Sequence, residues 1–326
     1  MAAVVADSRQ EGVDSVAGRL LAVLFALAYA AVLAGLPLME FMDRANYMTY
    51  ASRSSEILQS YAEQGWLVLL TNEPLWLLAN VGLGKLLSPE AVVRVIIFSS
   101  ALVVSYLAIR SSPRNAVWVI LFLLVPQVLK NHITHLRQGL AVAVFLSGWF
   151  SRRHGWRLAS FAMAPFIHSG FFFVLGLMAL THVVRRLRWA ADLRTIAFAL
   201  TGIAIGVGLP RLAPYLPARQ FQEYVFAAGD ISGLGFLFWG GILALMLLQP
   251  RQYLKEHAFE IGIVVFYLAL YPFVEISARV FENATLLVLL AGLRLTEPNR
   301  RLFLTCVLAY AVLTWGQRLL GPGPAF

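Results

Sequence analysis

The chain has 326 residues, of which 60% are hydrophobic and only 13% are charged. Soluble domains carry about 25% charged and about 45–50% apolar residues, so this composition excludes an ordinary soluble protein. A membrane-spanning helix needs about 20 apolar residues, and no polar block here is long enough to fold separately. We therefore expect residues 1–326 to form a single integral membrane domain embedded in a lipid bilayer.

The chain is basic, with 26 Lys and Arg against 17 Asp and Glu, a net charge of +9. Basic loops beside membrane spans set their orientation, and no basic stretch is interleaved with aromatic residues as in nucleic-acid faces. We therefore expect no nucleic-acid partner. The single cysteine, Cys306, can form neither an internal disulfide nor a cysteine-based metal site.

In chain order, a polar tail at 1–15 precedes a first apolar run at 16–39, which is too long for a signal-peptide core. Residues 66–87 are apolar but interrupted by Asn72, Glu73 and Pro74, which predicts a broken span or a surface helix. Nine further apolar runs lie at about 91–109, 115–129, 134–150, 158–182, 195–210, 232–248, 258–274, 277–293 and 302–319. The sequence predicts an all-α, polytopic transmembrane helix bundle with roughly 10–11 hydrophobic segments.

Clusters of basic residues suggest which loops face the cytoplasm. They lie at 110–114, 152–157, 185–194, 251–255 and 294–301. If all five are cytoplasmic, the polar segments between them face the outer side. These outer-side segments are 40–65, 130–137, 211–231 and the turn around 275–282.

The run 158–182 conflicts with this orientation, because basic clusters flank it on both sides. Either one cluster violates the rule, or the run is a re-entrant or broken helix pair. Pro165 and Gly170 bracket His168 and Ser169 at its middle, where a break would fall. Broken helices are tolerated at membrane depth where protein buries them or where they line a cavity.

Ionisable residues in apolar segments are costly and are usually functional or paired. Arg137 either snorkels from a helix end or joins Lys130, seven residues earlier on the same helical face, in binding an anion. Arg94 interrupts another apolar run, where its side chain can snorkel to the nearer membrane surface. His132 and His135 are three residues apart, but a third metal ligand is not evident, so interface histidines are the simpler interpretation.

His168 and Arg279 each have a structural and a functional interpretation. A lone histidine on an apolar helix is more often a core residue, but His168 lies beside Ser169 at the centre of the unusual run. A histidine can accept a proton near neutral pH. Arg279 shares one helical face with Glu275 and Glu282. The three residues either form a self-neutralised ladder of ion pairs, or the two carboxylates orient Arg279 towards a phosphate.

The acids nearest the expected outer face are Asp43 and Glu73, and Tyr47 and Tyr50 form either an interfacial belt or a sugar-stacking surface. The sequence lacks Asp-x-Asp, the ATP-binding P-loop and the Gly-x-Ser-x-Gly elbow. We therefore expect no bound metal and no cofactor.

The order of these motifs resembles the EpsG-type family of exopolysaccharide polymerases, which are Wzy-like. The resemblance covers about 40–295. Its residues are the early Asp43, Asn46 and Tyr47, then Glu73, then the Arg-Gln-x-Leu-Ala motif at Arg137 and Gln138, then His168 with Ser169, and finally Arg279.

The resemblance implies a multi-pass protein of the bacterial inner membrane that joins saccharide repeat units on its outer side. Donor and acceptor oligosaccharides are carried on undecaprenyl diphosphate, and a flippase and a chain-length regulator are expected partners. Arg137 and Arg279 would stabilise the leaving diphosphate, with Lys130 or Arg94 as helpers. His168 is the first candidate base and Glu73 the second. Asp43, Asn46, Tyr47, Gln138 and Ser169 would contact substrate.

Two other functions remain open from the sequence. A flippase or transporter of the lipid-linked unit would need cations along a path reached from both sides. A membrane glycan ligase or acyltransferase could use His168 in the same way. Polymerase and ligase are poorly separated by residues alone.

Overall fold

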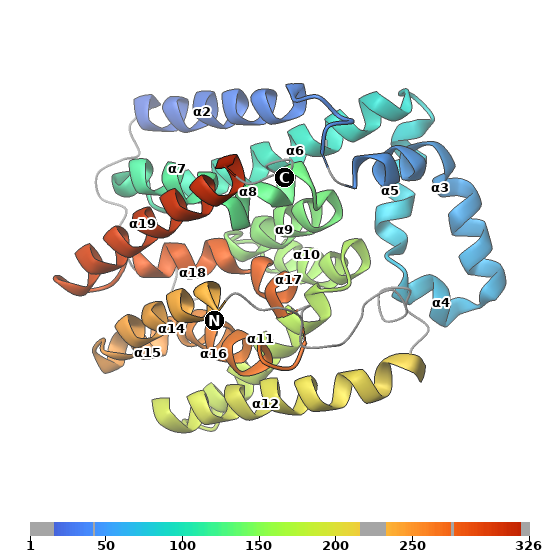
Figure 1. Ribbon diagram of the computed structural model, residues 1–326. Helices are drawn as coiled ribbons and strands as arrows, with labels where there is room; N and C mark the ends of the chain where they lie inside the picture. The colour runs from blue at the N-terminus through green and yellow to red at the C-terminus, as the bar shows by residue number, and fades with distance from the viewer. Residues whose placement is uncertain (1–15, 42, 216–232, 275–276, 321–326) are drawn as a thin grey trace. The chain divides into compact units, whose positions relative to one another are not determined.

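The structure is a computed structural model that describes residues 16–320 except 42, 216–232 and 275–276. Every regular element in these described residues is helical (Figure 1). The chain divides into two compact units. The first contains residues up to Phe171 together with the C-terminal segment from Leu313, and the second contains Phe172–Val312.

The helices of the first unit are largely short and separated by tight breaks. They are α2 (Val16–Gly35), α3 (Arg44–Gln64), α4 (Trp66–Thr71), α5 (Pro74–Gly84), α6 (Pro89–Ser111), η1 (Pro113–Asn115), α7 (Ala116–Leu124), α8 (Pro126–Ile133), α9 (Leu136–Trp149) and α10 (His154–Ile167).

The second unit follows, and its last helix ends in the segment that groups with the first unit. Its elements are α11 (Phe171–Arg186), α12 (Ala191–Leu212), η2 (Ala213–Tyr215), α14 (Leu234–Leu247), α15 (Arg251–Glu256), α16 (Ala258–Leu270), α17 (Ser277–Glu282), α18 (Thr285–Gly292) and α19 (Asn299–Leu320). Within this unit α16 is the central helix and packs against α12, α14, α17 and α18.

The predicted all-α membrane fold is confirmed. Four helices in the described part of the chain are long and apolar enough to cross a membrane: Gly18–Gly35, Pro89–Ser111, Ala191–Tyr215 and Asn299–Leu320. The segments Pro113–Leu124 and Pro126–Ile133, bent by 65°, count as a fifth if they form one span. The other apolar runs are built from shorter helices, including α5, α14 and α16.

Proline residues mark the breaks in the first unit. Pro74, Pro89, Pro113 and Pro126 each lie in the first turn of a helical element, where the missing N–H has no intrahelical partner to lose. The run 66–87 is accordingly two helices, α4 and α5. The run 158–182 is also broken, into α10 and α11 at His168–Gly170, which agrees with the broken helix pair among the alternatives above.

Two expectations from the sequence need correction. Lys130 and Arg137 do not lie on one continuous helix, because α8 ends at Ile133 and α9 begins at Leu136. The expected outer-side loop at 40–65 contains the 21-residue helix α3. Part of the other loop, 216–231, and the polar tail at 1–15 lie outside the described residues.

In the first unit α2 runs alongside α6, and α9 packs between α6 and α10 (Figure 1). α3 packs on α5 and α6, and α5 also contacts α10. Gly139 on α9 allows a close approach to α8. A Cβ at this position would overlap the Asn131 carbonyl, and backbone cannot rotate away as a side chain can. This contact fixes the start of α9, and therefore the position of Arg137.

We predict that Gly139→Ala destabilises the purified protein by about 1–3 kcal/mol, the usual cost of overpacking, measured as a lower thermal unfolding temperature in detergent. Gly155→Ala on α10 is the matched control, because a Cβ there meets no atom within 4 Å. The control should unfold at or slightly above the wild-type temperature, since alanine favours helix. Equal unfolding temperatures for the two variants would contradict the close contact.

Candidate active site

Glu73 lies in the break between α4 and α5 in an unusual backbone conformation. Its φ of 59° and ψ of 53° place it in the left-handed region, which is uncommon for a residue other than glycine and costs about 1–3 kcal/mol. The next residue, Pro74, starts α5 and further restricts Glu73. Such conformations persist where surrounding contacts enforce them, and they are concentrated at functional sites.

The contacts that hold Glu73 come from two distant parts of the chain. Arg137 at the start of α9 donates from its guanidinium to Oε2 at 2.5 Å. Ser169 donates to Oε1 from its backbone N–H at 3.0 Å and from its hydroxyl at 3.3 Å. His168 Nδ1 lies 3.1 Å from the same oxygen. The Glu73 side chain is only 2% exposed.

These contacts keep the carboxyl of Glu73 ionised. Glu73 lies outside the helices that are long enough to span a membrane. Burial raises the pKa of Glu73, but the Arg137 guanidinium and the hydrogen bonds from His168 and Ser169 outweigh it, so the pKa is lowered. An ionised carboxylate only accepts hydrogen bonds, so His168 Nδ1 must be the donor in this pair.

That assignment decides what the other side of the His168 ring can do. With a proton on Nδ1, a neutral imidazole carries its lone pair on Nε2. His168 immediately follows α10, and its side chain is 17% exposed, whereas Glu73 is enclosed. The pair is therefore a carboxylate that orients a histidine whose second nitrogen can accept a proton from a bound group.

An aromatic wall lies beside Arg137. Its guanidinium lies over the Tyr50 ring, 5.4 Å from the centroid. The Tyr47 and Tyr50 rings contact Trp76 edge-on, with centroids 5.7 and 6.1 Å away. All three aromatic residues are buried, so the two tyrosines do not form an exposed interfacial belt. They instead pack against Trp76, and Tyr50 also contacts the Arg137 guanidinium.

Asp43 and Asn46 lie at the start of α3 and contact each other. Asp43 precedes the helix in the left-handed conformation, with φ 65°, and Asn46 donates to its carboxylate at 3.4 Å. The Tyr47 backbone N–H bonds to the Asp43 carbonyl. Burial raises the pKa of Tyr47, and the nearby Arg137 guanidinium opposes that rise. In the early motif, Tyr47 therefore lies near Arg137, whereas Asp43 and Asn46 contact each other at the start of α3.

Three other predicted residues occupy different surroundings. Arg94 on α6 bonds to Glu90 one turn earlier at 2.8 Å and to the carbonyls of Ala34 and Leu36. Gln138 is buried beside Arg137 on α9, and Lys130 is half-buried on α8. The roles of these three residues in substrate binding stay predictions.

His132 is a structural residue. Its Nδ1 lies 3.2 Å from the Ser100 hydroxyl on α6, and its ring packs edge-on against Tyr29 of α2. Within the residues that the structure describes, no three His, Cys, Asp or Glu side chains are grouped as metal ligands would be.

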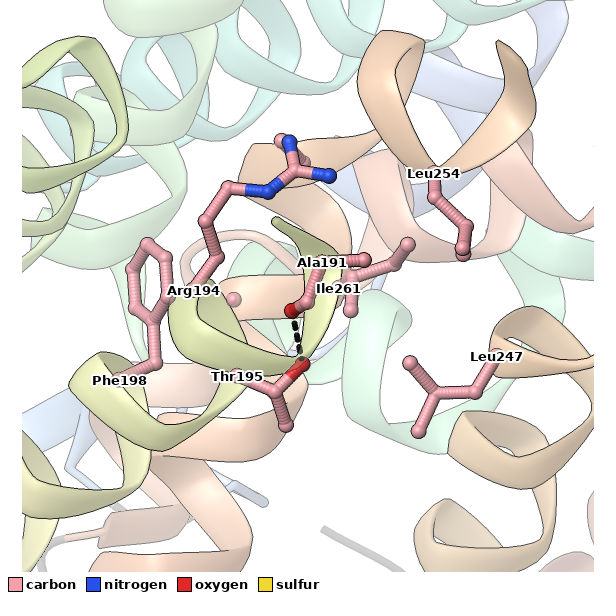
Figure 2. Close-up of a pocket in the computed structure, with 9 residues that line it drawn as sticks. Ala191, Arg194, Thr195, Phe198, Leu247, Leu254 and Ile261 are labelled. Atoms are coloured by element: carbon pink, nitrogen blue, oxygen red, sulfur yellow. Dashed lines mark hydrogen bonds between the residues drawn. The ribbon is translucent and has the colours of Figure 1, made fainter. Parts of the chain in front are cut away.

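The second unit contains Arg279 on α17, and Glu275 lies outside the described residues. The predicted action of Arg279 on the diphosphate stays a prediction. This unit also holds a small pocket between the start of α12 and helices α14, α15 and α16 (Figure 2). Arg194 is the one titratable residue in its lining, and Leu247, Leu254 and Ile261 make it apolar. The lining offers no base, so we do not place a reaction there.

Two buried residues of the first unit were not among the site residues predicted from the sequence. Arg44 sits inside the early motif, between Asp43 and Tyr47, and Trp76 follows Glu73 by three residues. Both are at most 1% exposed. A basic residue three positions before Tyr47 shares its helical face, and that spacing was the available signal for Arg44.

Comparison with known proteins agrees with this arrangement of motifs. No curated protein and no solved structure matches the chain. The EpsG family does match, over residues 18–317. That range contains the whole Glu73, Arg137 and His168 cluster and nearly all of the described helices. The chain is a membrane protein and belongs to the EpsG family.

Proposed function

We propose that this protein is a polysaccharide polymerase that joins undecaprenyl-diphosphate-linked repeat units at the outer face of the bacterial inner membrane. Membership of the EpsG family supports a role in exopolysaccharide biosynthesis. The observation that carries the enzymatic proposal is the contact of His168 Nδ1 with the buried Glu73 carboxylate, which Arg137 neutralises. A flippase and a chain-length regulator are the proposed protein partners.

The arrangement supplies a base for an inverting glycosyl transfer. A hydroxyl of the acceptor unit gives its proton to His168 Nε2 as its oxygen attacks the anomeric carbon of the donor. The bond from that carbon to the diphosphate oxygen breaks, and its electron pair leaves with the lipid diphosphate. The histidine then releases its proton to solvent. The donor ester supplies the energy, so the step uses no nucleotide, and we propose that it uses no metal.

Glu73 takes a positioning role in this proposal rather than that of a second base. Both of its oxygens already accept hydrogen bonds, and its side chain is 2% exposed. It therefore orients the His168 ring and stabilises the imidazolium that forms during transfer. Burial of the carboxylate strengthens this effect, because its charge acts through a low local dielectric.

Arg137 would present its remaining donors to the leaving diphosphate. Its side chain is 23% exposed, and a single guanidinium nitrogen is used on Glu73. Arginine binds phosphate oxygens through a planar fork and stays charged. Cations already placed where negative charge develops stabilise the transition state without reorganising.

A base positioned in this way favours a transferase over a flippase, because moving a lipid-linked unit breaks no bond. A glycan ligase uses the same chemistry on a different acceptor, so the products must separate the two.

We predict that deleting the gene in its bacterial host leaves lipid-linked single repeat units on the outer side of the membrane, measured by sizing surface and lipid-linked glycan. Restoring the wild-type gene should restore long chains. Full-length chains that stay unattached would indicate a ligase, and single units retained on the cytoplasmic side would indicate a flippase.

We predict that His168→Gln binds lipid-linked substrate but extends it at least ~10²-fold more slowly in single-turnover assays with purified protein. Glutamine keeps a hydrogen bond but cannot take a proton at neutral pH, and a positioned base contributes about 10²–10⁴-fold. His154→Gln, an exposed substitution at the other end of α10, is the control and should extend at the wild-type rate.

A double substitution separates positioning from an independent role of Glu73. If Glu73 acts through His168, adding Glu73→Gln to His168→Gln should slow extension little further, since residues that act as a unit are not additive. Near-wild-type extension by His168→Gln would rule out this histidine as the base. If the losses in extension rate of the two single variants multiply in the double variant, Glu73 has an independent catalytic role.

For Arg137 we expect lysine to preserve the ion pair but not the function. Arg137→Lys should reach the membrane and keep its unfolding temperature within a few degrees, yet extend chains at least ~10-fold more slowly, because lysine lacks the fork. Arg137→Met should unfold readily, since it leaves Glu73 buried and unpaired. The exposed Arg53→Lys serves as the control. Normal polymer length from Arg137→Lys would show that the arginine is structural.

A further inference from the structure

Helix α3 carries an arginine with unusual surroundings. Arg44, the first residue of α3, is 1% exposed, and all three of its guanidinium nitrogens are buried. None of these nitrogens has a hydrogen-bond partner among the described residues. The ring of Phe41 lies 5.6 Å from the guanidinium carbon, and such a ring attracts the cation but accepts none of its in-plane N–H donors.

A buried guanidinium without a carboxylate is costly. Burying a charge is tolerated when it is paired and hydrogen-bonded. Burial lowers the pKa of Arg44 to about 10, with Tyr47 opposing and Arg94 adding to this effect. Arg44 lies outside the long apolar helices. With this pKa it remains cationic at neutral pH. The protein maintains a positive charge here, and the described residues supply no hydrogen-bond acceptor for it.

The position of Arg44 connects it to the active-site cluster. Tyr47, one turn later on α3, opposes the lowering of the Arg44 pKa by burial, and Arg137 opposes the rise that burial causes in the pKa of Tyr47. Tyr47 also contacts Trp76 edge-on, and the indole N–H of Trp76 is a second buried donor without an acceptor in the described part of the chain. Tyr47 thus links two buried donors for which the described residues supply no acceptor.

The charge balance of the cluster indicates what should bind. Glu73 and Arg137 neutralise each other, and His168 must be neutral to act as a base. The described cluster therefore has no spare positive charge for a diphosphate, which carries at least two negative charges near neutral pH. Arg44 would supply that charge, and its five donors match phosphate oxygens.

We propose that Arg44 is an anion-binding residue of the site, which takes the diphosphate of the lipid-linked donor and displaces the Phe41 ring. The proposal rests on the proposed function, since it assigns that donor. The stability of the ligand-free protein distinguishes an anion-binding role of Arg44 from a structural one. A structural arginine stabilises the free protein, whereas an arginine that waits for a ligand costs stability until the ligand arrives.

The test measures binding and stability on the same purified, ligand-free proteins in nanodiscs. Radiolabelled undecaprenyl diphosphate is the probe, and undecaprenol is its uncharged analogue. Arg44→Met, which keeps an unbranched apolar chain, should bind the diphosphate at least ~10-fold more weakly, because the loss of a charge-assisted contact lowers affinity by about that factor. Its affinity for undecaprenol should not change, and its unfolding temperature should equal or exceed that of wild type.

Two further variants complete the experiment. Arg44→Lys, which keeps the charge without the fork, should bind the diphosphate with intermediate affinity. Arg53→Met is the matched control on the same helix. Arg53 is 63% exposed and pairs with Glu56, so its loss should alter neither diphosphate binding nor unfolding.

The outcomes separate this inference from the function on which it rests. Wild-type diphosphate affinity in Arg44→Met, or a lower unfolding temperature for that variant, would overturn the role of Arg44 and leave the polymerase proposal intact. Wild-type protein that binds undecaprenyl diphosphate no better than undecaprenol would instead remove the proposed donor, and the inference with it.

Discussion

The buried carboxylate of Glu73 is the constraint on which the site depends. An ionised side chain that is 2% exposed is stable only if its partners are supplied by the fold. Those partners come from 64 and 95 residues further along the chain. The starts of α5 and α9 and the end of α10 must therefore meet at one point, and the strained conformation of Glu73 is maintained by that meeting.

Breaks between helices make this meeting possible. Glu73, Arg137 and His168 all lie at helix ends, where backbone groups are not used within the helix and side chains can converge. Ser169 is an example, because its backbone N–H lies in the break between α10 and α11 and donates to Glu73. In a protein with many apolar helices, such interruptions are where polar groups can be enclosed by protein.

The arginines of the first unit illustrate three uses of one side chain. Arg94 bonds to Glu90 and to two backbone carbonyls of the α2 end, which ties α6 to that segment. Arg137 neutralises Glu73 and keeps part of its surface accessible. Arg44 is buried without acceptors in the described structure. Paired arginines stabilise the fold, whereas the unpaired one carries a cost that a bound anion would offset.

The sequence alone determined the membrane class, the all-helical fold and the helix breaks at Pro74 and near His168, because these follow from composition and local backbone restrictions. It also selected Glu73, Arg137 and His168, since ionisable residues are conspicuous in apolar segments. Only the tertiary structure decided that these three touch and that Lys130 and Arg137 lie on different helices. It also decided that the Arg44 guanidinium finds no hydrogen-bond acceptor among the described residues. Helical periodicity describes neighbours within a few turns, whereas contacts across 64 or 95 residues depend on how separate helices pack.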